Sequence, residues 1–197
     1  GVLQGFYPMV EEVDEAPFLD YHLGEDSGSL FKVNGYCGGS GDFRWRGLDV
    51  TEYTPYEPKA KTDEQAISRD LIPLIRCINQ REDLAFQVCI EEHLDVDVWL
   101  RYIAADVALP DVDGFIGSGQ NFMLYRSEQG PWLIWPWDKD LALSLTNLGV
   151  DSLYEVHPIW NETFRSVLGT RLVRVYRSRY CEEMLGVTQA LEQLRST

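Results

Sequence analysis

The chain has 197 residues, of which 45% are hydrophobic and 12% aromatic, and its formal net charge is −15. This composition is typical of a globular protein, and the length suffices for one good core or for two small lobes that share a cleft. The negative charge argues against nucleic acid or an anionic membrane surface as a partner. No apolar run approaches the roughly 20 residues that span a bilayer, so we also expect no membrane partner.

The N-terminal segment, residues 5–14, has the pattern of a strand that ends in acidic residues. It lacks the basic region of a signal peptide, and the chain does not begin with Met. We therefore expect a piece of a longer protein. A loop containing Pro17 and Gly24 is predicted to follow this strand.

A second short strand is predicted over residues 28–33, and it carries a single lysine, Lys32. Burial of a lysine in an apolar strand is costly unless its ammonium group meets an anion. Two interpretations remain open. Lys32 is either a phosphate-contacting lysine paired with an acid such as Glu11, or an edge-strand lysine that discourages aggregation.

The middle of the chain has helical periodicity. Residues 62–78 open with a Thr-x-x-Gln capping-box pattern, and Pro73 should kink or split this helix. A second helix is predicted around Leu84 to His93. A third begins with Asp95 as its N-cap and stops at Pro110.

The four cysteines, at positions 37, 77, 89 and 181, form no Cys-x-x-Cys pair, and no His lies close enough to them to suggest a zinc site. Cys77 and Cys89 lie among apolar residues of the predicted helices. We therefore expect both to be buried free thiols.

Residues 121–138 predict an antiparallel hairpin, because two apolar runs flank a turn-like segment over residues 127–130. Such a hairpin brings Asn121 beside Asp138. A glycine-rich loop that contains Asp111 and Asp113 lies just before it. Carboxylate and amide oxygens are the ligands that Mg²⁺ prefers, although the same residues are equally consistent with turn chemistry and solvation at a strand end.

The order Asp113, Asn121, Asp138 is also the order of parts in kinase-type phosphoryl transfer. There the first Asp orients the hydroxyl nucleophile, and the Asn and the second Asp hold metal ions. A rival interpretation is a hydrolase that uses Asp138 with Asp140, or Asp111 with Asp113. Glycosidases hold such carboxylates about 5 to 9 Å apart, which residues two positions apart meet only loosely.

The C-terminal part, residues 160–194, is predicted to be helical, with Gly169 and Gly186 as breaks. It contains a basic cluster in an otherwise acidic chain: Arg165, Arg171, Arg174, Arg177 and Arg179. Two interpretations are open, a solvated face that pairs with the acidic remainder of the chain and a docking site for an acidic substrate.

Four blocks of the sequence together resemble the CotH (spore coat protein H) family of atypical protein kinases. In chain order they are Gly5-Phe-Tyr-Pro-Met-Val-Glu11-Glu-Val-Asp14, Gly28-Ser-Leu-Phe-Lys32, Leu94-Asp-Val-Asp97, and Asp113 followed by Asn121-Phe-Met-Leu-Tyr, Trp132 and Trp135-Pro-Trp-Asp138-Lys-Asp140. Phe31 stands where the family usually has Tyr. The resemblance covers about residues 5–140.

The resemblance implies an α+β, protein-kinase-like fold of two lobes in a single domain over residues 1–197. Residues 1–60 would be the remnant of a truncated N-terminal β lobe. Residues 61–197 would form a mostly helical C-terminal lobe, with the catalytic hairpin at residues 111–140.

The resemblance also implies that the protein binds ATP and Mg²⁺ and phosphorylates Ser or Thr of a protein substrate. The implied roles are a catalytic acid at Asp113, metal ligands at Asn121 and Asp138, a phosphate-binding lysine at Lys32 with Glu11 as its partner, and adenine-stacking rings at Phe31 and Trp132.

From the same resemblance we expect a monomer at the spore coat, at the cell surface or outside the cell. The alternative is a noncatalytic kinase-like module for adhesion or coat assembly, in which the acidic residues bind a divalent cation. Stabilisation by nucleotide would distinguish the kinase from this module.

Overall fold

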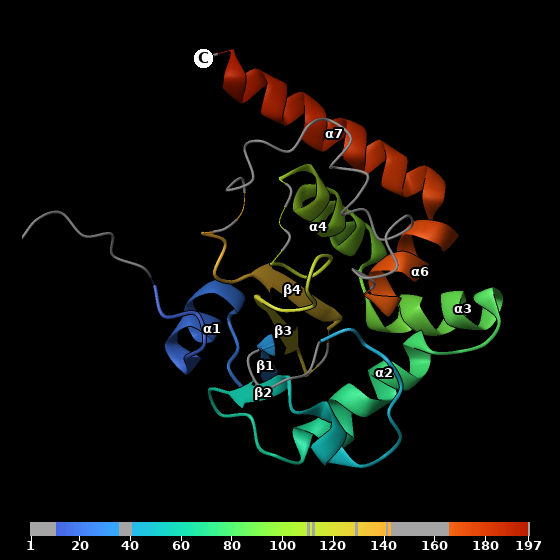
Figure 1. Ribbon diagram of the computed structural model, residues 1–197. Helices are drawn as coiled ribbons and strands as arrows, with labels where there is room; N and C mark the ends of the chain where they lie inside the picture. The colour runs from blue at the N-terminus through green and yellow to red at the C-terminus, as the bar shows by residue number, and fades with distance from the viewer. Residues whose placement is uncertain are drawn as a thin grey trace, which may run out of the picture.

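The computed structural model describes residues 11–35, 41–109, 111, 113–128, 130–140, 142 and 166–196. It shows a four-stranded antiparallel sheet flanked by helices (Figure 1), which confirms the α+β class. In chain order the elements are α1 (Ala16–Leu23), β1 (Ser29–Val33), the 3₁₀-helix η2 (Val50–Tyr53), β2 (Tyr56–Lys59), the π-helix η3 (Ile67–Leu71), α2 (Ile72–Ile78), α3 (Asp83–His93), α4 (Val96–Ala108), β3 (Phe122–Arg126), β4 (Trp132–Pro136), α6 (Val167–Val175) and α7 (Arg177–Arg195).

The sheet has the strand order β2-β1-β3-β4, with every neighbouring pair antiparallel. β1 therefore lies inside the sheet, and Lys32 pairs with Glu57 of β2 on one side and Met123 of β3 on the other. The interpretation of Lys32 as an edge-strand lysine is wrong for this reason.

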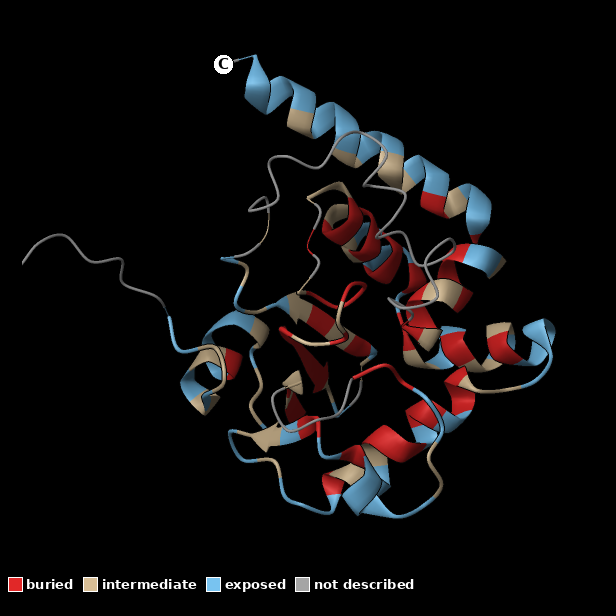
Figure 2. Cartoon of the chain, in the orientation of Figure 1, coloured by how far each residue is buried: buried red, intermediate tan, exposed pale blue. Residues whose placement is uncertain are grey.

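Each face of the sheet packs against a different layer. Phe31 and Leu124 lie on the face that contacts the large helical core, whereas Leu30 and Met123 lie on the opposite face. That second face is covered by Leu19 of α1, and all five side chains are fully buried. Figure 2 shows the buried band that runs from the sheet into α2 and α4. The sheet thus lies between two layers, and α1 packs on the side of Lys32.

Helix α1 occupies the segment that was predicted to be a loop. Pro17 lies in its first turn, where a missing backbone N–H costs nothing, and Gly24 ends it with a φ of 72°. These two residues are helix-boundary signals as well as loop signals, and the helix between them is only eight residues long. The described part of the predicted N-terminal strand, residues 11–14, contains no strand; its residues 5–10 lie outside the described chain.

The first predicted helix of the middle region is split, as expected from Pro73. The π-helix η3 leads into α2, which has Pro73 in its first turn. The capping box at Thr62 is wrong. Its hydroxyl accepts a hydrogen bond from the backbone N–H of Leu30 at 2.7 Å, so Thr62 is tied to β1 instead of beginning a helix.

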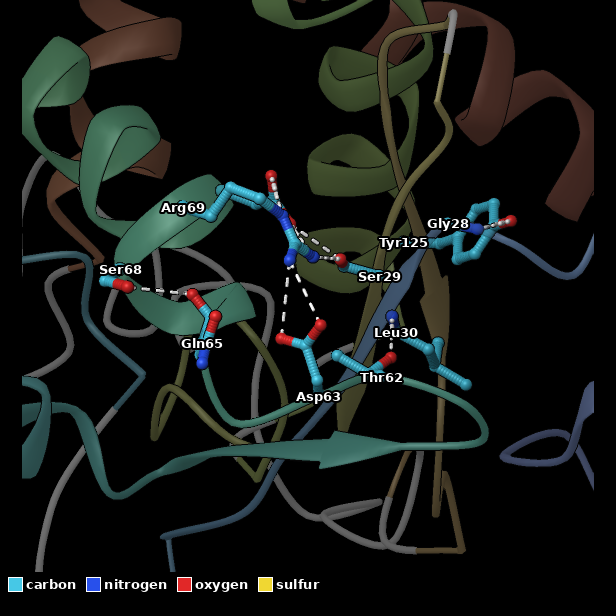
Figure 3. Close-up of polar contacts among 10 residues, drawn as sticks. Gly28, Ser29, Leu30, Thr62, Asp63, Gln65, Ser68, Arg69 and Tyr125 are labelled. Carbon is cyan, nitrogen blue, oxygen red and sulfur yellow. Dashed lines mark hydrogen bonds and ion pairs between the residues drawn. The ribbon is translucent and has the colours of Figure 1, made fainter.

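A polar cluster joins η3 to the start of β1 (Figure 3). The guanidinium of Arg69 donates to the Ser29 hydroxyl at 3.1 Å and forms an ion pair with Asp63 at 3.1 Å. The Ser29 hydroxyl donates in turn to Asp70 at 2.6 Å. These contacts hold the first residue of the inner strand β1 against η3.

Cys77 of α2 and Cys89 of α3 form a disulfide, with their Cα atoms 5.8 Å apart. The expectation of two free thiols is therefore wrong. Helical periodicity places each cysteine on the apolar face of its own helix, but it does not say that the two faces meet. Cys181 is exposed and free, and Cys37 lies outside the described residues.

The third predicted helix is confirmed as α4. The Asp95 carboxylate accepts hydrogen bonds from the N–H groups of Asp97 and Val98, as an N-cap should. α7 lies alongside α4 (Figure 1), and Arg101 of α4 pairs with Glu183 of α7 at 2.9 Å. The C-terminal helix is therefore docked on the core helix that leads into the candidate site.

The break in the C-terminal helices lies at Tyr176, between α6 and α7, and not at either predicted glycine. Gly169 lies inside α6, where a Cβ would be 2.6 Å from the Ile116 Cδ1 atom. Gly186 lies inside α7, where a Cβ would meet no atom within 4 Å. Gly169 thus permits close packing and does not interrupt a helix.

The arginines of this region pair with acidic residues and backbone. Arg174 forms an ion pair with Asp83, and Arg179 forms one with Asp97. Arg171 is only 9% exposed and donates to backbone carbonyls of the α2–α3 connection. The ion pairs of Arg174 and Arg179 agree with the interpretation as a solvated face that pairs with the acidic remainder, whereas the buried Arg171 is not part of a solvated face. Arg165 lies outside the described residues. Within the described chain, no helix is both long and apolar enough to cross a membrane.

Candidate functional site

The predicted hairpin is formed by β3 and β4, and its register places Phe122 opposite Pro136. Pairing continues one residue further, because the Trp137 N–H donates to the Asn121 carbonyl at 3.1 Å. The Asn121 N–H donates to the Val33 carbonyl at 3.0 Å, so β1 ends at the same place. Asp138 directly follows Trp137, and the hairpin thus brings the backbones of residues 121 and 138 to one end of the sheet.

Asn121 and Asp138 both adopt a left-handed backbone conformation, with φ values of 57° and 50°. Asn and Asp tolerate this conformation better than other non-glycine residues. The conformation takes their side chains out of the alternation of the strands. It also ends β4 at Pro136, so the strand does not continue toward Asp140.

The carboxylate of Asp113 is held by donors from its own loop. The Asn121 Nδ2 atom donates to the Asp113 Oδ2 atom at 2.9 Å. Gln120 Nε2 and the Ser118 hydroxyl both donate to Asp113 Oδ1, the latter at 3.3 Å. Among the described residues, none donates a hydrogen bond to Asn121 Oδ1, which leaves this oxygen available to an external ligand.

A buried ion cluster lies beneath this loop. Lys139 Nζ is 2.5 Å from Asp111 Oδ2 and 3.3 Å from Asp106 Oδ1. The Asp106 Oδ2 atom accepts the Ile116 N–H at 3.0 Å, and burial raises the pKa of Asp106 to about 6. The cluster ties the loop that contains Asp111 to Lys139, which follows β4. The neighbouring Asp138 stays exposed.

Lys32 lies on the face of the sheet that α1 covers. Its Nζ atom is 3.7 Å from Asp14 Oδ2 and 4.0 Å from the centre of the Trp137 ring, and its side chain is 19% exposed. Lys59 of β2 lies 3.9 Å from the same Asp14 carboxylate. Lys32 is therefore in contact with the residue that immediately precedes Asp138.

The acidic partner of Lys32 is Asp14, and the structure does not bring Glu11 to it. The Glu11 carboxylate instead contacts His22 Nε2 of α1 at 2.9 Å. The two acids belong to the same acidic segment, three residues apart. Sequence alone could not decide between them, because that segment forms neither the predicted strand nor any other regular element.

The two aromatic candidates for nucleotide stacking, Phe31 and Trp132, are buried in the helical core. Their ring centroids are 6.0 Å apart, and Trp99 Nε1 donates to the Trp132 carbonyl at 3.0 Å. By the register of the sheet both side chains lie on the face opposite Lys32. Both rings therefore pack against the helical core, on the face of the sheet that is remote from Lys32.

Asp106 and Lys139, which support the site, were missed from the sequence. Asp106 did leave a signal, because it stands on the apolar face of α4 between Ile103 and Val107. An acid in such a place needs a partner. Its partner is separated from it by 33 positions, and only the fold reveals it.

The described geometry thus joins the Asp113 carboxylate to the Asn121 side chain and brings the backbone of Asn121 next to the residue before Asp138, whose carboxylate is exposed. Hard divalent cations such as Mg²⁺ favour this donor set. A carboxylate that is fixed by several donors can accept a proton from a hydroxyl group placed against it.

The comparisons with known proteins agree with the resemblance seen in the sequence. The family model described as CotH kinase protein matches residues 1–193. A curated relative, the inner spore coat protein H of Bacillus subtilis (strain 168), is 37% identical over 86 residues, which make up 43% of this chain and 22% of the relative. The matched segment therefore spans about a fifth of that relative. Because the family model covers nearly the whole sequence, the chain belongs to the CotH kinase protein family.

Proposed function

We propose that this chain transfers the γ-phosphoryl group of ATP to a Ser or Thr hydroxyl of a protein substrate, with Mg²⁺ as the metal. The family name supports kinase chemistry. The observation that carries the proposal is the connection of Asp113, Asn121 and Asp138. Asn121 donates from its side chain to Asp113 and accepts at its carbonyl from the residue before Asp138.

Each residue has a role in this proposal. Asp113 accepts the proton of the acceptor hydroxyl as its oxygen attacks the γ-phosphorus and the bond to the leaving ADP oxygen breaks. Gln120 and Asn121 hold the Asp113 carboxylate in the orientation that this step requires. Lys32, beside Trp137, supplies positive charge for the phosphates.

The oxygen atoms available at the site fit Mg²⁺. Asn121 Oδ1 accepts no hydrogen bond from the described chain, and the Asp138 carboxylate is exposed, so both can serve as ligands. When bound, the ion would neutralise negative charge that develops on the phosphate oxygens. The protein framework for this chemistry is proposed to be protein-kinase-like, with the sheet as the remnant of one lobe and the helices as the other.

The place of action and the partner follow from the relative that carries the name inner spore coat protein H. We propose a spore-coat or cell-surface location and a protein substrate of the same setting. The net charge of −15 favours a partner other than nucleic acid or an anionic membrane. The chain is proposed to act as a monomer.

A noncatalytic coat or surface module remains the second candidate. The burial of Phe31 and Trp132 favours it, because neither ring is open to an adenine base in this structure. In that case the acidic residues would hold a divalent cation without phosphate transfer.

The test of the catalytic proposal is the Asp113→Asn variant of the full-length protein, assayed with Mg²⁺, ATP and a Ser-rich acidic protein such as dephosphorylated casein. A general base acts mainly in the transition state, so we expect turnover to fall by about 10²- to 10⁴-fold. Nucleotide affinity, measured in parallel, should stay nearly unchanged.

The matched control is Asp20→Asn, which removes an exposed carboxylate on α1 far along the chain from the loop. It should transfer phosphate as the wild type does. Wild-type turnover in Asp113→Asn would contradict the role of Asp113. A wild-type protein that binds Mg²⁺ but transfers no phosphate to any protein hydroxyl would favour the noncatalytic module.

A further inference from the structure

A second cluster of metal-ligating side chains lies away from the hairpin, between α2 and α3. It consists of Cys77 on α2 together with Cys89 and His93 on α3. The two sulfur atoms and a ring nitrogen of His93 all lie within 4.8 Å of one another. Four ligands around a tetrahedral zinc ion, at zinc distances of about 2.0–2.3 Å, are separated by roughly 3.3–3.8 Å. Small side-chain movements would therefore complete this geometry.

The spacing on α3 is that of a metal half-site. Cys89 and His93 are four residues apart in one helix, which places both side chains on the same face. Cys77 is 2% exposed and the other two residues are half-buried, so the cluster is sheltered but not closed. A fourth position for water is compatible with this exposure.

His93 carries an unsatisfied nitrogen at this cluster. The Nδ1 atom is buried and has no hydrogen-bond partner in the part of the chain that the structure describes. A buried polar atom that is left unpaired is energetically unfavourable. A metal ion bound through Nδ1 would give this atom a partner.

The arrangement of α2 and α3 does not depend on the disulfide alone. The Arg171 side chain donates to the carbonyl of Ile78 at 2.8 Å and to that of Glu82 at 3.1 Å, and so bridges the two ends of the connection. Its guanidinium also lies 4.4 Å from the centre of the Phe86 ring. The helices should therefore remain together when the bond between the cysteines is broken.

We propose that Cys77, Cys89 and His93 form a Zn²⁺ site that replaces the disulfide when the cysteines are reduced. A dithiol reductant would give two electrons and two protons to the S–S bond and become a disulfide itself. Zn²⁺ would then displace the two thiol protons, since thiolate and neutral imidazole are its usual ligands. Because the same sulfur atoms serve both states, the disulfide and the metal exclude one another.

The experiment uses full-length protein in a Cys37→Ser/Cys181→Ser background, so that Cys77 and Cys89 are the only cysteines of this chain. Protein reduced with a phosphine should bind one Zn²⁺ per chain by metal analysis. Co²⁺ as a probe should give sulfur-to-cobalt charge-transfer absorption. The oxidised protein should bind neither metal.

The informative variant is His93→Ala, which leaves the disulfide intact and is checked for folding in the oxidised state. Loss of residues that merely orient a metal ligand costs about 10- to 100-fold in affinity. Loss of a ligand should therefore weaken Zn²⁺ binding by more than about 100-fold. His22→Ala, at an exposed histidine on α1, is the control and should bind as the parent does.

Three results would overturn the proposal. These are no Zn²⁺ bound by the reduced parent, parental affinity in His93→Ala, or equal binding by oxidised and reduced protein. Unfolding of the reduced protein that Zn²⁺ does not reverse would also count against it, because a structural zinc site contributes its binding free energy to folding.

Discussion

At the scale of single residues, the candidate site depends on charges that face in opposite directions. Lys139 turns inward to Asp106 and Asp111, whereas its neighbour Asp138 is exposed. A buried ion cluster of this kind fixes geometry more than it adds stability, because the desolvation of the charges offsets much of their attraction. The cluster holds the chain just after Asp138, and the hydrogen bond from the Trp137 N–H to the Asn121 carbonyl holds it just before, while the Asp138 side chain is exposed.

Asp106 gives this cluster a defined pH dependence. Burial raises its pKa to about 6, above the value of about 3.9 expected in the unfolded chain. Between these values the folded protein binds more protons than the unfolded one, so the free energy of unfolding falls as pH rises. The stability that protonated Asp106 contributes is complete below about pH 4 and is lost as pH rises through about 6.

The test is Asp106→Asn, which can still accept the Ile116 N–H but does not titrate. The free energy of unfolding should be measured in urea from pH 4 to pH 7. Across this window, the value for the variant should rise relative to that of the wild type by on the order of 1–3 kcal/mol. Parallel stability curves for the two proteins would show that Asp106 is not the group that titrates there.

The sequence predicted the surroundings of a residue well where its partners lie nearby in the same hairpin, and poorly where they lie in a distant segment. The proximity of positions 121 and 138 was predicted because hairpin pairing is a short-range property, and the register does bring their backbones to one end of the sheet. The acid beside Lys32 was assigned to the wrong position of its segment, because that contact joins an irregular segment to a central strand. The side of the sheet to which Phe31 points depends on which layer covers which face, and sequence alternation does not supply that.

At the scale of elements, short or irregular segments were the ones that the sequence did not predict. α1 has eight residues and β2 has four, and neither has the apolar pattern that revealed the five-residue strands β1, β3 and β4. Longer elements were found, and Asp95 was identified correctly as the N-cap of α4. The disulfide between α2 and α3 depends on the packing of two helices, which no local pattern encodes.

Substitution of the two glycines of the C-terminal helices by alanine should change the stability of the fold in opposite directions. In α6, a Cβ at Gly169 would be 2.6 Å from Ile116 Cδ1, so Gly169→Ala should destabilise the fold by about 1–3 kcal/mol through overpacking. In α7, Gly186 faces open space, so Gly186→Ala should stabilise it by about 0.5–1 kcal/mol through helix propensity.

Urea unfolding of the two single variants measures both effects in the same protein. A gain in stability for Gly169→Ala would mean that α6 does not pack closely on the loop at Ile116, and a loss for Gly186→Ala would contradict the account of Gly186. That loop leads directly to Asp113, so this experiment also tests the contact between the C-terminal helices and the candidate site.

At the scale of the whole molecule, the sheet separates two environments. The helical core fills one face, and α1 covers the other face (Figure 1). Lys32 and Asp14 form their ion pair on the side of α1. The end of the sheet nearest Asn121 lies where β1, β3 and the residues after β4 meet. A site at such a junction draws on residues from four separate segments. The sequence therefore revealed the order of the motifs, but it did not reveal most of the contacts that join them.

The central claim is that Asp138 belongs to an Mg²⁺- and ATP-binding site at this junction. The most direct test is the free energy of unfolding of full-length protein with and without Mg²⁺ and ATP. At about 100 times the Kd, binding to the folded state should add roughly 2.7 kcal/mol. Asp138→Ala should lose this gain, whereas Asp140→Ala, which removes an exposed carboxylate two positions away, should keep it. An undiminished gain in Asp138→Ala, or no gain in the wild type, would contradict the account.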